Sequence, residues 1–273
     1  MLDVVELELR VTPTADPVME WLPREDRELH ARIYADGDRY HLWTDREGWF
    51  SIDPPGRAIT VPPVPDPIRL EERLWGFPAL LCYLARGELP LHAAAVDVGG
   101  SAILFAAPGH FGKTTLAAAF HMAGHRVLAD DISCCRLEPV PSILPGPSVL
   151  RMRRDSYERL DPSGAEITAD HPGRVHLALN AERRGDGAPV PLRGIVFLRT
   201  GEPVRTQVVA TGRSLPDLWA LSLKLPSDAD RARCFQATAA LAGSVPVWNL
   251  YRPLEFEGLP RIVERVIDTC LET

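Results

Sequence analysis

The chain has 273 residues, of which 45% are hydrophobic, and a formal net charge of −7. This hydrophobic fraction is enough to form a hydrophobic core and excludes a disordered chain. The negative net charge excludes sequence-independent electrostatic binding to nucleic acid or to an anionic membrane. No run approaches the ~18 apolar residues of a membrane span and no signal peptide is recognised, so we expect a soluble protein. The five cysteines lack metal-ligand spacing, and their odd number fits the reduced cytoplasm.

Residues 1–66 contain short alternating runs, VVELELRV, ARIYADGDRYHLW and GWFSID, separated by proline- and glycine-containing turns. They predict a small β-rich N-terminal module. The proline-rich segment VPPVPDP then serves as a connector. Residues 67–88 follow with leucines at helical spacing and predict a connecting helix that ends at Gly87, with a kink or break at Pro78.

From Leu89 onward, strand-like and helix-like segments alternate, and this pattern predicts an α/β domain over residues 89–273 with a mostly parallel sheet. Its later part is expected to contain helices at 214–224 and 228–242, a strand VPVWNLYR and a closing helix at 259–271. The adjacent Cys134 and Cys135 lie in a strand-like run, where ordinary packing is the expected role.

The segment LFAAPGHFGKTTLAAAF has an apolar strand, a glycine-containing loop and a helix start in succession. A loop at a helix N-terminus directs several backbone N–H groups toward one point, which favours a bound phosphate. Lys113 can reach the outer phosphates and the Thr114 hydroxyl can ligate Mg²⁺. Ala107 at the first position leaves the backbone donors in place. The residues expected to contact ATP are Pro108, Gly109, His110, Phe111, Gly112, Lys113, Thr114 and Thr115.

An apolar strand, HRVLA, ends in Asp130 and Asp131 one helix after the loop. The carboxyl end of such a strand lies beside the phosphate loop, where Asp130 can hold a metal ion or its waters. A second carboxylate beside the first suggests a separate role in accepting a proton. The alternative is that Asp131 only opens a turn.

LHAAAVDV and SAILFAA flank Gly99 and Gly100, and this arrangement predicts a hairpin with a two-residue loop. In that register Val98 pairs with Ser101, and His92 lies opposite Ala107 at the start of the phosphate loop. A lone histidine in an apolar strand is more often structural, but here the register brings the imidazole to the mouth of the site.

The segment from Leu91 to Asp131 resembles the catalytic core of the HPr kinase/phosphorylase superfamily, bacterial phosphate-loop serine kinases. The resemblance implies an HPr-kinase-like fold, ATP and Mg²⁺ as cofactors, and an active site built from His92, Lys113, Asp130 and Asp131. It implies that His92 and Lys113 contact phosphate, that Thr114 holds Mg²⁺, and that Asp131 is the general base.

The family's HPr-phosphorylating enzymes carry a Glu-Ile-Arg-Gly signature after the aspartates, whereas this chain has SVLRMRRDS at the comparable place. The chain therefore looks more like the compact relatives encoded beside peptide natural-product pathways, including kinases of lasso-peptide precursors. PLRGIVFLRT and VPVWNLYRPL also resemble that group. The implied partner is a peptide or small protein with an acceptor serine, and a homo-oligomer is plausible.

Phosphoryl transfer is helped by a further cation near the developing charge. The candidates are Arg151, Arg153, Arg154 and Arg174, and the sequence does not choose among them. For substrate recognition we expect the N-terminal module and a loop at 161–186, whose ERRGDG stretch is basic enough to meet an acidic peptide.

The sequence thus favours an ATP-dependent kinase that phosphorylates a serine of a peptide. Three alternatives remain open: an HPr-type kinase/phosphorylase, a nucleotide-binding switch without chemistry, and a small-molecule or phosphoenolpyruvate-carboxykinase-like enzyme. The aspartate pair and His92 argue against the switch, because a switch needs no group to accept a proton.

Overall fold

The computed structural model describes residues 3–22, 30–55, 57–147, 149–162, 164–171, 173–179 and 187–271. The chain forms two compact units. One comprises Met1–Glu88 and Lys224–Arg233, and the other comprises Leu89–Leu223 and Cys234–Thr273.

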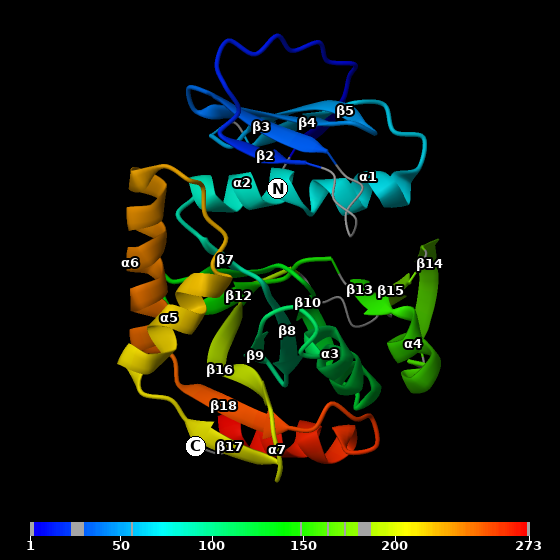
Figure 1. Ribbon diagram of the computed structural model, residues 1–273, viewed down its shortest axis with the longest axis vertical. Helices are drawn as coiled ribbons and strands as arrows, with labels where there is room; N and C mark the ends of the chain where they lie inside the picture. The colour runs from blue at the N-terminus through cyan, green and yellow to red at the C-terminus, as the bar shows by residue number, and fades with distance from the viewer. Residues whose placement is uncertain are drawn as a thin grey trace. The chain divides into compact units, whose positions relative to one another are not determined.

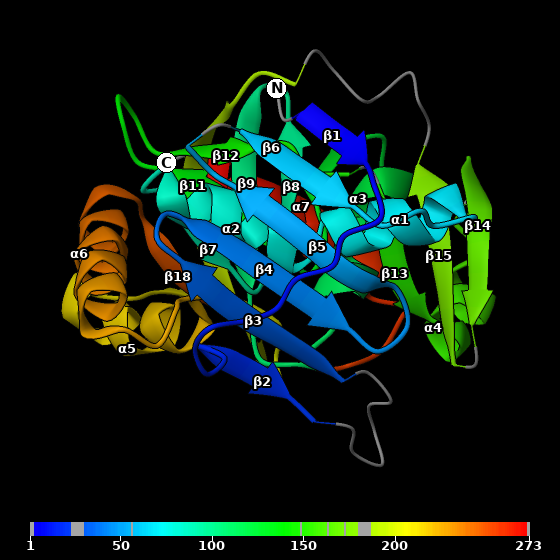
Figure 2. The same ribbon diagram turned by 90° about the horizontal axis from the view of Figure 1, so that it is seen from above.

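The first unit contains a six-stranded sheet in the order β1-β6-β5-β4-β3-β2, in which β1 and β6 are parallel and the other neighbours antiparallel (Figure 2). Its side chains alternate: Ile33, Leu42 and Phe50 are buried, as expected for a sheet with one covered face. The strands are β1 (Asp3–Glu6), β2 (Met19–Trp21), β3 (Ala31–Asp36), β4 (Arg39–Thr44), β5 (Gly48–Asp53) and β6 (Ala58–Val61).

Two helices, α1 (Pro67–Leu74) and α2 (Phe77–Ala85), follow the sheet where a single connecting helix was expected. The predicted break near Pro78 is confirmed, because this proline occupies the first turn of α2, where a missing N–H costs nothing. Leu81 and Cys82 of α2 share a buried cluster with the sheet, so the helices cover one face of it.

The second unit is built on a nine-stranded sheet in the order β10-β8-β9-β16-β12-β11-β7, with β18 beside β16 and β17 beside β18 (Figure 1). Only β9, β16 and β18 are mutually parallel among these described pairings, so the prediction of a mostly parallel sheet is wrong. The strands are β7 (Leu89–Leu91), β8 (Ala93–Val98), β9 (Ser101–Ala106), β10 (Arg126–Ala129), β11 (Ser133–Arg136), β12 (Ser142–Leu144), β16 (Val190–Thr200), β17 (Arg205–Val208) and β18 (Val247–Arg252).

The sheet is covered on both faces, and alternate side chains of β9 point to different cores. Ile103 and Phe105 join a cluster with α3 and α7, whereas Leu104 joins one with α5 and α6. The helices are α3 (Lys113–Met122), α5 (Thr211–Leu221), α6 (Asp228–Ser244), of which the part from Cys234 belongs to this unit, and α7 (Leu259–Leu271).

A separate three-stranded sheet, β13-β15-β14, and the short helix α4 (Arg154–Leu160) complete the second unit. Its strands are β13 (Val149–Arg153), β14 (Ala165–His171) and β15 (Arg174–Leu179). The prediction of a loop at 161–186 is therefore wrong for most of that range, since β14 and β15 pair as a hairpin there. Most of the ERRGDG stretch lies outside the described residues.

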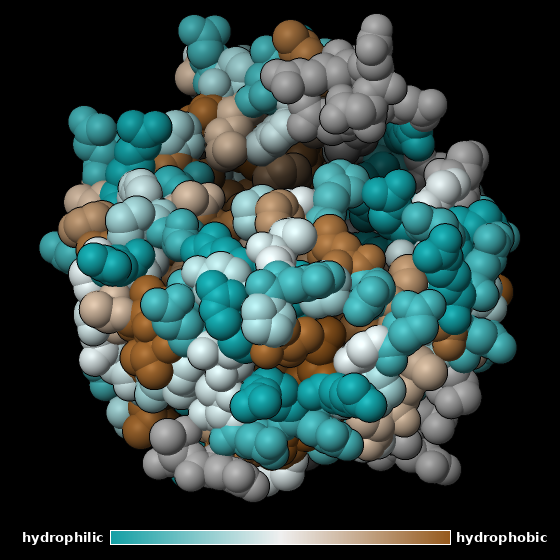
Figure 3. Space-filling view, turned by 60° about the horizontal axis from the view of Figure 1, so that its bottom comes forward, coloured by the Kyte–Doolittle hydropathy of each residue, from teal (hydrophilic) through white to brown (hydrophobic). Residues whose placement is uncertain are grey.

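All five cysteines are free and buried, which agrees with the packing role expected for Cys134 and Cys135. No helix in the described part of the chain is long and apolar enough to cross a membrane. On the face shown in Figure 3, hydrophobic residues form small areas separated by hydrophilic ones.

Candidate active site

The phosphate loop joins the end of β9 at Ala106 to the start of α3 at Lys113. His110 and Gly112 have φ angles of 69° and 76°, in the left-handed region. A Cβ atom at Gly112 would lie 2.5 Å from Nη2 of Arg252. Both the backbone conformation and this close approach require glycine at position 112.

The hairpin β8–β9 has the predicted register, with Val98 paired to Ser101 and Ala93 paired to Ala106. Gly99 and Gly100 both have positive φ angles, as a two-residue hairpin loop of the favoured kind requires. His92 directly precedes β8 and therefore lies beside the start of the phosphate loop, and its own N–H is bonded to the Leu221 carbonyl at 2.8 Å.

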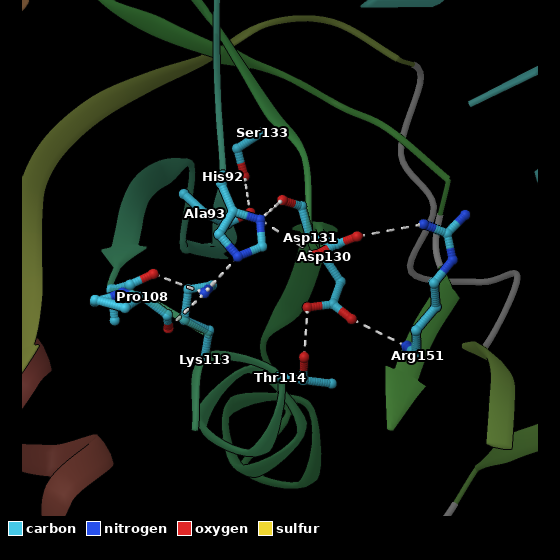
Figure 4. Close-up of polar contacts among 10 residues, drawn as sticks. His92, Ala93, Pro108, Lys113, Thr114, Asp130, Asp131, Ser133 and Arg151 are labelled. Atoms are coloured by element: carbon cyan, nitrogen blue, oxygen red, sulfur yellow. Dashed lines mark hydrogen bonds and ion pairs between the residues drawn. The ribbon is translucent and has the colours of Figure 1, made fainter. Parts of the chain in front are cut away.

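Lys113 is almost completely buried, and its ammonium group has three acceptors (Figure 4). Nζ donates to the carbonyl oxygens of Ala107 at 2.8 Å and Pro108 at 3.1 Å, and lies 3.1 Å from Nε2 of His92. Burial lowers the pKa of Lys113. The three acceptors fix the ammonium group at the start of the loop.

The imidazole of His92 connects the lysine to the aspartates (Figure 4). Nδ1 lies 3.1 Å from the Asp131 carbonyl oxygen and 3.3 Å from its carboxylate Oδ1. Burial, followed by the charge of Lys113, lowers the pKa of His92. A neutral ring with its proton on Nδ1 satisfies every contact, because Nε2 then accepts from Lys113 while Nδ1 donates to Asp131.

Asp130 is buried and has a partner for each carboxylate oxygen. The Thr114 hydroxyl donates to Oδ1 at 2.9 Å and the Arg151 backbone N–H donates to Oδ2 at 2.9 Å. Burial raises the pKa of Asp130. No group of three or more histidine, cysteine or acidic side chains is placed to hold a metal within the described ranges. A hydroxyl with one carboxylate is nevertheless a donor set that suits Mg²⁺, which keeps several waters.

Asp131 has a φ of 71° and is the middle residue of the three that separate β10 from β11, so it does take part in a turn. Its carboxylate, 44% exposed, also faces the site: Oδ1 lies near His92, and Oδ2 lies 3.9 Å from Nη1 of Arg151. Asp131 therefore both forms part of the turn and places a carboxylate in the site.

A cavity of about 400 Å³ lies over these groups. Six of the eight residues expected to contact ATP line it, namely Gly109, His110 and Gly112–Thr115. Six cationic side chains line it against three carboxylates, in a chain whose net charge is −7. A local positive field of this kind favours a polyanion. The cations are Lys113, Arg151, Arg153, Arg159, Arg174 and Arg252.

Of the four arginine candidates, Arg151, Arg153 and Arg174 line the cavity, whereas Arg154 is not among its lining residues and pairs with Asp170. Arg153 and Arg174 are direct partners across the β13–β15 ladder. Like charges opposite each other destabilise a sheet, and a bound anion would relieve their repulsion.

Arg252 was missed by the sequence analysis. It is 2% exposed, and its Nη2 donates to the carbonyl oxygens of Phe111 at 3.1 Å and Gly112 at 3.4 Å, so it supports the phosphate loop from behind. Burial lowers the pKa of its guanidinium, and its buried Nε has no hydrogen-bond partner. The available signal was an arginine at the end of an apolar strand. The structure places that strand, β18, two positions from β9 in the sheet, with β16 between them.

No protein-family model matches the chain, and no curated protein sequence matches it. Among solved structures, the chain is similar to the Hpr(Ser) kinase/phosphatase from Coxiella burnetii, with 12% sequence identity and a TM-score of 0.36. The similarity covers 67% of this chain and 97% of that chain. A likeness this weak carries no conclusion about what the chain binds or does.

Proposed function

We propose that the protein is an ATP- and Mg²⁺-dependent kinase that transfers the γ-phosphoryl group to a serine hydroxyl of a peptide or small protein. The observation that carries this proposal is the convergence of Lys113, the Thr114–Asp130 pair and Asp131 on one loop at the N-terminus of α3. A site that only binds phosphate would need Lys113 but neither the Thr114–Asp130 pair nor Asp131.

The cavity offers the triphosphate of ATP both positive charge and hydrogen-bond donors. Backbone N–H groups at the N-terminus of α3 face the loop, and Lys113 and the arginines add positive charge. The lysine would exchange a contact with a backbone carbonyl or with His92 for a phosphate oxygen. Arg153, which lies 3.5 Å from Asp155, and Arg174, its partner across the two strands, would gain a further anion between them.

Mg²⁺ would be held by the Thr114 hydroxyl and by Asp130, directly or through water. When bound, the ion supplies charge neutralisation between the outer phosphates. The raised pKa of Asp130 reflects a carboxyl that is costly to keep charged in a buried place, and a cation there would favour its charged form.

In the transfer step, the serine oxygen forms a bond to the γ-phosphorus while the bond from that phosphorus to the β–γ bridging oxygen breaks. The hydroxyl proton passes to the Asp131 carboxylate, and the nucleoside diphosphate leaves with the bridging electron pair. His92 donates from Nδ1 to the Asp131 carbonyl oxygen and so fixes the turn that carries this carboxylate, while Nη1 of Arg151 lies 3.9 Å from its Oδ2.

The acceptor class rests on the sequence resemblance to the compact kinases of peptide pathways. SVLRMRRDS replaces the signature of the HPr-phosphorylating enzymes, and PLRGIVFLRT and VPVWNLYRPL resemble the compact group. A ribosomally made precursor, such as that of a lasso peptide, is the acceptor we propose. The positive cavity would also favour acidic residues near the acceptor serine.

Incubation of the protein with γ-labelled ATP, Mg²⁺ and a serine-containing peptide library tests the proposal. Label should appear on serine, and Asp131→Asn should lower transfer by about 10²-fold or more while ATP binding persists. Asp155→Asn, which removes another carboxylate from the same cavity, is the matched control. ATP binding without label on any peptide would identify a nucleotide switch instead.

A further inference from the structure

The cavity that carries the phosphate-binding groups also has an aromatic wall. Leu254 and Phe256 line it from the loop that follows β18, and Arg159 lines it from α4. Leu254 is 55% exposed and Phe256 is half-buried against the core. Arg159 adds to the positive charge of the cavity, but neither Leu254 nor Phe256 has a role in the proposed phosphoryl transfer.

The position of this wall follows from the strand directions. β9, β16 and β18 are parallel, so the loops after β9 and β18 leave the sheet at the same edge. Arg252 joins them directly through its hydrogen bond to the Phe111 carbonyl. Ligands of open α/β sheets bind outside the carboxyl ends of parallel strands, and a nucleotide held by the first loop extends past its neighbours.

Arg159 and Phe256 form a stacked pair, with the guanidinium carbon 5.4 Å from the ring centroid. A second cavity of about 490 Å³ shares both residues with the first. Its other lining is mainly apolar, with Ala119, Met122 and Leu160 among it. The polar cavity therefore adjoins apolar surface at the Arg159–Phe256 pair.

We propose that the Arg159–Phe256 pair is the nucleoside subsite, on which the purine base of the nucleotide stacks while its phosphates occupy the loop. This inference rests on the proposed function. An aromatic ring and a guanidinium plane both offer a stacking surface to a base, and a purine covers more of that surface than a pyrimidine does. Leu254 covers the base from the solvent side.

Calorimetric titration with Mg²⁺-ATP and, separately, with Mg²⁺-inorganic triphosphate tests the subsite. Phe256→Ala should raise the Kd for ATP by about tenfold or more and leave the Kd for triphosphate unchanged, because only ATP has a base to stack. Phe256→Trp keeps a stacking surface and should retain the ATP affinity. Phe235→Ala, which removes a partly exposed aromatic ring from α6, is the control.

Unchanged ATP binding by Phe256→Ala would overturn the inference, as would an equal loss for ATP and triphosphate, which would indicate damage to the loop or the fold. If the wild-type protein binds triphosphate as tightly as ATP, the proposed nucleoside subsite is wrong, but the proposed phosphate site is still supported. Wild-type protein that binds neither ligand would overturn the proposed function itself.

Discussion

Nζ of Lys113 lies 3.1 Å from Nε2 of His92, so the two bases of the site share a contact that only a neutral imidazole can make. A protonated ring would direct an N–H at the ammonium group. The lowered pKa of His92 is the expected consequence of burial beside that charge.

Replacing His92 by phenylalanine keeps a ring of similar shape but removes both polar contacts. We expect phosphoryl transfer to fall by about one to two orders of magnitude, because the Asp131 carbonyl oxygen loses the donor that fixes the turn carrying its carboxylate. The ATP affinity should change much less. Single-turnover rates and ATP titrations separate these effects, and a variant with an unchanged rate would remove His92 from the mechanism.

Thr114→Val removes the hydroxyl that donates to Oδ1 of Asp130 with little change in volume. The variant should need about tenfold more Mg²⁺ for half-maximal transfer and should lose about 1–3 kcal/mol of unfolding free energy, since a buried carboxylate oxygen is left without its donor. Mg²⁺ titration and urea unfolding measure the two effects. Thr211→Val, at an exposed position of α5, is the control, and equal behaviour of the two variants would contradict the assignment.

Gly112→Ala should cost more stability than Gly124→Ala. Both glycines have positive φ angles, but a Cβ at position 112 would meet the buried Arg252 guanidinium, whereas nothing lies within 4 Å of one at position 124. Each variant has the backbone strain of about 1 kcal/mol, and overpacking adds about 1–3 kcal/mol at position 112 alone. Urea unfolding of both variants checks this difference, and identical losses would show that the loop moves away from Arg252.

Thiol labelling should distinguish the native from the unfolded protein at pH 8. Burial raises the pKa of Cys135 to about 12, against an ordinary value of 9.0, so its thiolate fraction at pH 8 falls by about a thousandfold. Native protein should leave this cysteine unmodified by a thiol reagent, and denatured protein should titrate five thiols. Reactivity should rise with pH while the fold persists, and mapping of rapid native labelling to Cys135 would contradict the packing.

The parts of the site that follow from local chain geometry were predictable. The two-glycine loop fixes the register of the β8–β9 hairpin, and that register brings His92 to the phosphate loop. The predicted closing helix at 259–271 coincides with α7. In each case the local structure is determined by a turn or by a helical period that involves only residues close together in the sequence.

The parts that depend on distant pairing were not predictable. Alternating strands and helices do not state strand direction, and β11 and β12 turned out antiparallel to their neighbours. The β14–β15 hairpin is local and differs from the expected loop at 161–186; the alternating buried residues Val175, Leu177 and Leu179 of β15 were its available signal. Arg252 could not be placed under the loop, since 141 positions separate it from Phe111.

That separation sets an order of events during folding. The carbonyl groups of the phosphate loop receive the Arg252 guanidinium only after β18 has docked on β16. A nascent or truncated chain that ends before residue 252 would contain every predicted loop residue but not the support beneath them. Nucleotide binding should therefore require β18 as well as the motif itself.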